Sequence, residues 1–241
     1  MSPEFSGVYR AMSVIYLKEV EALKNRVLSM SALVEESVLR SVFAFKENDV
    51  ELARDIIKRD DRIDILEVEI EEECLKIMAL HQPVASDLRF ITSFMRINTN
   101  LERIGDLAVN IAQQVVKIHA SDLFVPEINF DDIAERAKAM LKQALDAFLN
   151  LDTELAAHVR GLDNAVDKRN RKIQKKLIAC IKANPEKTED YLRVLRVSRK
   201  LERVADLAVD ICELVIYITR GEIVRHRPEN ETFDEPEDEK E

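Results

Sequence analysis

The sequence predicts an all-α protein built as two tandem three-helix bundles, six long helices in all, related by an internal repeat. Its composition supports this class: 46% of the 241 residues are hydrophobic and 34% charged, with only four Gly and six Pro, as is typical of long amphipathic helices. An eleven-residue segment also appears twice, as LERIGDLAVNI from Leu101 and as LERVADLAVDI from Leu201. The second copy therefore predicts a second bundle like the first.

Proline residues mark the expected helix limits, because a proline ring interrupts a helix interior. The markers are Pro83, Pro126, Pro185 and Pro228. The expected helices are 14–46, 49–81, 83–120, 131–150, 152–183 and 187–220. Asn48 or Asp49 is expected to cap the second helix at its start, and Gly221 to end the last one.

The repeat extends well beyond the eleven-residue copies. AFKENDVELA from Ala44 aligns with AFLNLDTELA from Ala147, and a shortening near Pro185 changes the offset between the halves from 103 to 100. The expected domains are a first bundle at 1–120, a linker at 121–130, a second bundle at 131–227 and an acidic disordered tail at 228–241.

Hydrophobic residues at heptad spacing identify the expected core. On the second helix they are Ile56, Ile63, Ile70 and Ile77, and on the third helix Leu101, Ile104, Ala108, Ile111 and Val115. Stripes of this period pack helices against one another. We expect them to be buried and to hold no cofactor.

Charge is distributed unevenly along the chain. The net charge is −10, but the segment 228–241 alone carries eight acids and one Lys, and its few apolar residues predict disorder. The stretch 160–203 carries fourteen Lys or Arg against six acids, which fits either a solvated helix face or a docking surface for an acidic partner. Only one aromatic residue, Tyr191, lies there, so nucleic-acid binding is not expected.

No segment is apolar enough to span a bilayer, and the first thirty residues do not resemble a signal peptide. We therefore expect a cytoplasmic protein. An enzyme is not expected, because the sequence has no phosphate-cradling glycine loop, no nucleophile elbow and no Glu-x-x-His pair of the di-iron bundles.

Acidic side chains recur at a spacing of four, opposite the core stripe, in both halves. In the first half they are Asp60 with Asp64, and Glu102 with Asp106, followed at the same spacing by the amide Asn110; in the second half they are Asp163 with Asp167, and Glu202 with Asp206 and Asp210. Residues four apart share one helix face. Each bundle is therefore expected to present two acidic pairs on two helices.

Two interpretations of these pairs remain open from the residues alone. Like charges at this spacing repel, and a cation would remove the penalty; carboxylates are hard oxygen ligands that suit Mg²⁺, Ca²⁺, Mn²⁺ or ferric iron and not zinc or copper. Alternatively, acid pairs of this spacing arise by chance in a chain with 46 acids, and ancestry could preserve a solvated face in both repeats. The matched recurrence is what favours metal binding.

Several longer segments resemble one known family. They are DDRIDILE (60–67), HQPVASDLR (81–89), the two eleven-residue copies and YITRGEIVRH (217–226). Together they are similar to the PhoU family of phosphate-signalling regulators, over residues 23–226. The resemblance implies a non-enzymatic negative regulator of phosphate uptake and of the phosphate-starvation response. Its partners would be the ATPase of the phosphate ABC transporter and a two-component sensor kinase, with the membrane reached only through them, and a homodimer is a further implication.

The resemblance also implies metal sites, with iron the first expectation and Mn, Mg or Ca as alternatives. One implied site holds Asp60, Asp64, Glu102 and Asp106, and the other holds Asp163, Asp167, Glu202 and Asp206, with Asn110 and Asp210 as additional ligands one turn further on. Leu107 and Leu207 stand where the family often has His, and Ala205 replaces Gly105 in the second copy, which predicts slightly wider helix spacing there. Two alternatives to the regulator are a metal-storage bundle and a structural adaptor whose acidic faces are only solvated.

Overall fold

The computed structural model describes residues 3–119 and 130–225, with side chains from Val14 onward. Every regular element in these ranges is helical, in agreement with the predicted class. The elements are α1 (Pro3–Glu47), α2 (Val50–Arg59), α3 (Asp61–His81), α4 (Ala85–His119), α5 (Asp131–Asn150), α6 (Thr153–Arg160), α7 (Asp163–Ala183), the 3₁₀ turn η1 (Pro185–Lys187) and α8 (Thr188–Arg220). The predicted linker at 121–130, apart from Phe130, and the acidic tail at 228–241 lie outside the described residues.

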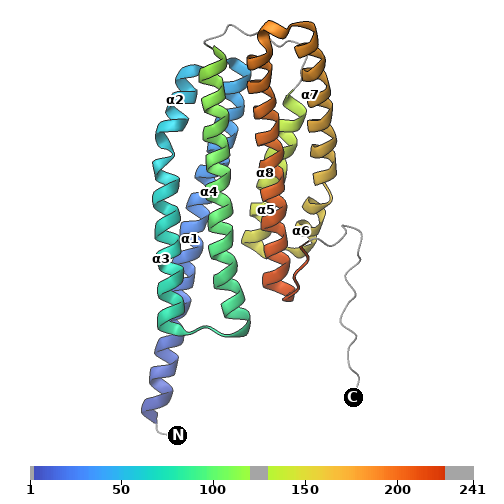
Figure 1. The fold of residues 1–241 in the computed structure, drawn as a ribbon. Coiled ribbons are helices and arrows are strands. Elements are labelled where there is room, and N and C mark those ends of the chain that lie inside the picture. Colours follow the sequence, from blue (N-terminus) through green and yellow to red (C-terminus); the bar gives the residue numbers. More distant parts are fainter. Residues whose placement is uncertain (1–2, 120–129, 226–241) are drawn as a thin grey trace, which may run out of the picture.

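The two helical triplets lie side by side, and α4 and α8 run in opposite directions along the seam between them (Figure 1). The first triplet comprises α1, the α2–α3 rod and α4, and the second comprises α5, the α6–α7 rod and α8. In Figure 1 the α2–α3 rod and α7 lie on opposite outer sides of the molecule.

Three predicted helix limits were wrong. The first helix begins at Pro3 instead of residue 14, and the helices predicted at 49–81 and 152–183 are each interrupted once. At Asp60 the backbone stays in the right-handed helical region, and the amide of Ile63 bonds the Asp60 carbonyl at 2.7 Å. A similar hydrogen bond between residues three apart joins the amide of Leu162 to the carbonyl of Val159. The chain tightens locally at both places, which bends a helix without ending its course.

The two short helices α2 and α6 begin with the same capping arrangement. The carboxylate of Asp49 accepts a hydrogen bond from the amide of Leu52, and that of Asp152 accepts from the amides of Glu154 and Leu155. Each cap follows a residue with positive φ, at Asn48 and Leu151. The structure therefore selects Asp49 as the cap from the two predicted candidates. Gly221, with φ of +74°, ends α8 as expected.

One hydrophobic core runs through both triplets. The heptad isoleucines of the first triplet and the apolar stripe of α4 are all buried, as predicted. Most of them belong to the same cluster as the buried residues of α5 and α8. The ring centroids of Phe94 on α4 and Phe148 on α5 lie 4.9 Å apart across the seam. The two repeats thus stabilise each other by sharing apolar contacts.

Gly105 allows α3 and α4 to approach closely. A Cβ atom at this position would lie 3.0 Å from Cδ1 of Ile63. The equivalent positions of the second repeat hold Ala205 and Val166, so a methyl group gained on one helix is lost from the other. This exchange conserves the core volume, and a packed core tolerates volume-conserving exchanges best. It removes the reason for predicting wider helix spacing in the second repeat.

Candidate carboxylate sites

Four of the predicted acidic residues come together between α3 and α4. Asp60 lies at the bend between α2 and α3 and Asp64 one turn later, while Glu102 and Asp106 lie on the outer face of α4. The missing side chain of Gly105 brings α4 against Asp60: a Cβ there would be 3.8 Å from its Oδ1. We name Asp60, Asp64, Glu102 and Asp106 the first carboxylate cluster.

Burial and mutual repulsion alter the titration of this cluster. Burial, followed by the charges of Asp64, Asp106 and Asp61, raises the pKa of Asp60 from 3.8 to about 6. Burial, followed by Asp106, also raises the pKa of Glu102. Each carboxylate is thus held near others at an electrostatic cost, which the binding of a cation would relieve.

Two further acids of α3 belong to the same electrostatic environment. The negative charge of Asp61 helps to raise the pKa of Asp60, and that of Glu67 helps to raise the pKa of Glu102. Burial and the charges of Glu71 and Asp64 raise the pKa of Glu67 itself. Glu67 was not predicted, because it lies three residues after Asp64 and the predicted pairs are four apart. A residue seven positions after Asp60 also shares its face.

The second repeat assembles a smaller cluster between α7 and α8. Burial raises the pKa of Glu202, and the charges of Asp206 and Asp167 raise it further. We name Asp167, Glu202 and Asp206 the second carboxylate cluster. Asp163, the counterpart of Asp60, begins α7, and it is not among the groups that raise the pKa of Glu202.

The two additional candidates one turn further on have other contacts. The side-chain amide of Asn110 donates to the backbone carbonyl of Asp106 at 2.7 Å. Burial raises the pKa of Asp210, whereas the charges of Arg203, Arg225 and Arg96 lower it. Asp210 therefore lies between the second cluster and a group of arginines.

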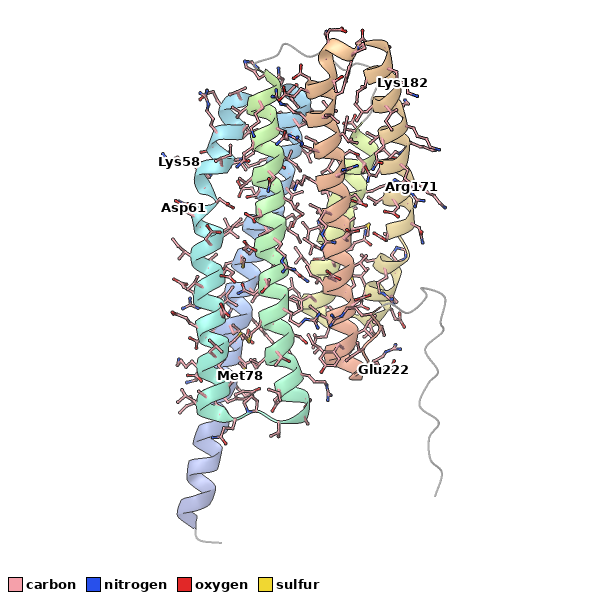
Figure 2. The ribbon with its side chains drawn as sticks, in the orientation of Figure 1. Lys58, Asp61, Met78, Arg171, Lys182 and Glu222 are labelled. Carbon is pink, nitrogen blue, oxygen red and sulfur yellow. The ribbon has the colours of Figure 1, made fainter. Side chains whose placement is uncertain are left out.

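The clusters differ in how far arginines neutralise them. Arg171 pairs with Asp167 at 3.0 Å and Arg203 with Asp206 at 2.9 Å. In the described part of the chain, no Lys, Arg or His nitrogen lies within 4.0 Å of a first-cluster carboxylate. Figure 2 places Asp61 and Arg171 on opposite outer sides of the molecule, so the two clusters are separate sites.

The chemistry of the first cluster suits a hard cation, because its donors are carboxylate oxygens; the charge of Arg103 acts on Glu102, but the two form no ion pair in the described part of the chain. Within residues 3–119 and 130–225, however, no three His, Cys, Asp or Glu side chains are grouped as a metal ion requires. The donor set therefore fits in charge and chemistry, and binding requires the carboxylates to turn toward one another.

The fold and the carboxylate faces define a tandem-repeat helical protein in which each repeat carries one acidic face. The family model of the PhoU domain matches residues 27–115 and 130–215. This chain therefore belongs to the PhoU family.

Relatives and solved structures of that family extend the match to nearly the whole fold. A phosphate-specific transport system accessory protein PhoU homolog of Aquifex aeolicus is 36% identical over 210 residues, which cover 87% of this chain and 95% of the relative. The crystal structure of PhoU from Pseudomonas aeruginosa matches with a TM-score of 0.83 at 34% identity, covering 86% of this chain and all of that one.

A second crystal structure, of the phosphate transport system regulatory protein PhoU from Streptococcus pneumoniae, matches with a TM-score of 0.80 at 29% identity. It covers 87% of this chain and 99% of that one. The described part of this chain contains no helix that is both long and apolar enough to cross a bilayer.

Proposed function

We propose that this protein is an accessory regulator of a phosphate-specific transport system and that it acts by binding partners, not by catalysis. The observation that carries the proposal is the match of both repeats to the PhoU domain, at 27–115 and 130–215. The named relatives are accessory or regulatory proteins of phosphate transport. In this role it works in the cytoplasm as a negative regulator of phosphate uptake and of the phosphate-starvation response.

The proposed partners are the ATPase of the phosphate ABC transporter and a two-component sensor kinase. The long, shared core supports a contact mechanism, since it makes the two triplets one stiff body that can present two faces at once. Purified full-length protein should bind each partner domain in a titration by light scattering or calorimetry. Failure to bind both, with and without added metal, would remove the proposal.

We also propose that the first carboxylate cluster binds a hard cation, with iron the first candidate and Mn, Mg or Ca the alternatives. The raised pKa of Asp60 and of Glu102 supports this, because a cation would stabilise the ionised carboxylates that the protein itself leaves unneutralised. The second cluster is a weaker candidate, since Arg171 and Arg203 already pair with two of its acids.

Elemental analysis of protein purified without chelator tests the metal proposal. Asp64→Ala with Asp106→Ala should abolish binding at the first cluster, and Asp167→Ala with Asp206→Ala should remove the weaker site only. Metal absent from the wild type after reconstitution with iron, manganese, magnesium and calcium would favour the adaptor with solvated acidic faces. A storage role is less well supported, because the acids lie at the surface and not inside the bundle.

Self-association forms part of the same proposal. The outer face of α3 exposes three apolar side chains at helical spacing, Ile65, Val68 and Leu75, and a homodimer would cover them. Sedimentation of the wild type should show a dimer that Val68→Glu shifts toward monomer. A wild type that sediments as a monomer at high concentration would exclude this part.

A further inference from the structure

A pocket of about 240 Å³ with both polar and apolar walls lies on the seam between the two repeats. Its walls come from α4, from the last turns of α8 and from the segment 221–225 that follows α8, near the labelled Glu222 in Figure 2. None of the residues of the two carboxylate clusters line it, although Arg96 precedes Glu102 by six residues on α4 and Glu213 follows Asp206 by seven on α8. A liquid water occupies about 30 Å³, so the pocket can hold a small polyatomic ion with several waters.

Two arginines line this pocket without a strong partner. Arg96 comes from α4 and Arg225 from the segment after α8. Neither has a carboxylate oxygen within 4.0 Å among the described residues, although the charges of Asp210 and Glu213 act on Arg96. Burial, followed by the charge of Arg225, lowers the pKa of Arg96. Both arginines are exposed residues, so solvent screens their repulsion, and a bound anion would relieve what remains of it.

Neutral donors lie beside the arginines. Ser93 lies at the pocket wall; its hydroxyl is closed to solvent and has no hydrogen-bond partner in the described part of the chain, so a bound anion reaches it only if the side chain turns. Tyr217 contributes a phenol from α8. A buried hydroxyl without a partner is uncommon and calls for an explanation. Guanidinium and hydroxyl groups together match the oxygen atoms of a tetrahedral oxyanion.

One carboxylate in the pocket determines which oxyanion fits. Glu213 lines the pocket and lies 3.8 Å from the buried Arg160, which offsets its charge. Its carboxylate can accept a hydrogen bond but not donate one. Inorganic phosphate near neutral pH still carries a proton to donate, whereas sulfate carries none. A phosphate monoester is mostly doubly ionised, because its second pKa is about 6. The carboxylate thus disfavours sulfate and esters.

We propose that this seam pocket binds inorganic phosphate, with Arg96 and Arg225 holding the anion and Glu213 accepting its proton. The inference rests on the proposed function, since a phosphate site would let the regulator respond directly to phosphate supply. Because Arg96 belongs to the first repeat and Arg225 to the second, a bound phosphate joins the two triplets.

The test is calorimetric titration of the full chain with sodium phosphate at neutral pH, in chelator and at constant ionic strength. Chelator removes phosphate binding through metal at the carboxylate clusters. We expect one saturable site per chain, with sulfate and methyl phosphate bound at least tenfold more weakly. Arg96→Gln and Arg225→Gln should each weaken phosphate binding by about tenfold or more, the effect of one charge-assisted hydrogen bond.

Arg196→Gln is the matched control, because this exposed arginine of α8 lies about 25 Å along the helix from Glu213 at 1.5 Å per residue. It should leave binding unchanged. Absence of saturable binding, or equal weakening by Arg196→Gln and Arg96→Gln, would overturn the site. Equal or tighter binding of sulfate or methyl phosphate would overturn its assignment to inorganic phosphate.

Both arginines are exposed, and Arg225 lies after the last helix, so both variants should fold and Arg225→Gln decides the matter if Arg96→Gln does not. The titration uses no partner protein. A pocket that binds no phosphate therefore leaves the proposed partner binding intact, and a chain that captures no partner leaves the titration valid.

Discussion

The substitution Asp60→Asn should stabilise the metal-free protein near neutral pH. The native state raises the pKa of Asp60 from 3.8 to about 6, so the folded protein holds this proton more tightly than the unfolded chain does. Ionisation of Asp60 therefore costs native stability, with no cost below about pH 4 and the full cost above about pH 6. Asparagine cannot ionise, and it keeps the size and the helix-start preference of aspartate.

The magnitude follows from the same pKa difference. At 1.36 kcal/mol per pKa unit the span from 3.8 to about 6 corresponds to about 3 kcal/mol as an upper bound. Asp60 is only half-buried, and solvent screening reduces the gain to about 1 kcal/mol. For a chain of this length that gain raises Tm by about 2–4 °C.

Urea unfolding in chelator, followed by circular dichroism between about pH 4 and pH 7.5, measures the effect. The advantage of Asp60→Asn should be near zero at the acidic end and grow as pH rises through 6. Asp61→Asn is the control: it removes an exposed neighbouring charge that acts least on Asp60, so its gain should be smaller. An advantage that is absent at pH 7, or equal at every pH, would refute the reasoning.

Three further predictions concern packing and charge. Gly105→Ala alone should leave the unfolding free energy nearly unchanged, because a helix-propensity gain of about 1 kcal/mol is offset by the 3.0 Å approach of the new Cβ to Cδ1 of Ile63. In an Ile63→Val background the same change should stabilise the protein by about 1 kcal/mol. Additive effects of the two substitutions in a double-mutant cycle, measured by urea unfolding, would contradict this. Phe94→Ala removes a buried ring that meets the second repeat and should cost about 3–5 kcal/mol of unfolding free energy, in one cooperative transition, whereas two separate transitions would show that the repeats fold independently. Arg171→Gln with Arg203→Gln frees two acids of the second cluster and should raise its affinity for Mn²⁺ about tenfold by calorimetry; unchanged affinity would show that these arginines do not compete with the metal.

The acidic positions illustrate how far a one-dimensional pattern carries. Spacing alone placed Glu102 and Asp106 on one face of a helix, because the helical period is fixed by the backbone. It did not show that Glu67 joins them from α3, since that depends on how two helices are packed. The pairs Arg171–Asp167 and Arg203–Asp206 join residues four and three apart on one helix, so the same spacing that places the acids also allows these pairs.

The interruptions at Asp60 and at Gly161 and Leu162 were not predicted for a similar reason. Their backbone angles remain helical, and neither site contains a proline, the residue that marks the predicted helix limits. A bend of this kind is decided by packing of the rod against its neighbours, which propensity along the chain does not encode.

By itself the sequence determined the helical class, the two repeats and the buried stripes, because amphipathic period and repetition are local properties that each segment carries wherever it lies. Only the tertiary structure decided that both repeats share one core, that Glu67 of α3 joins the acids of α4, and that Arg96 and Arg225 line a common pocket. These features depend on distances between residues far apart in the chain, and such distances are fixed only when helices pack.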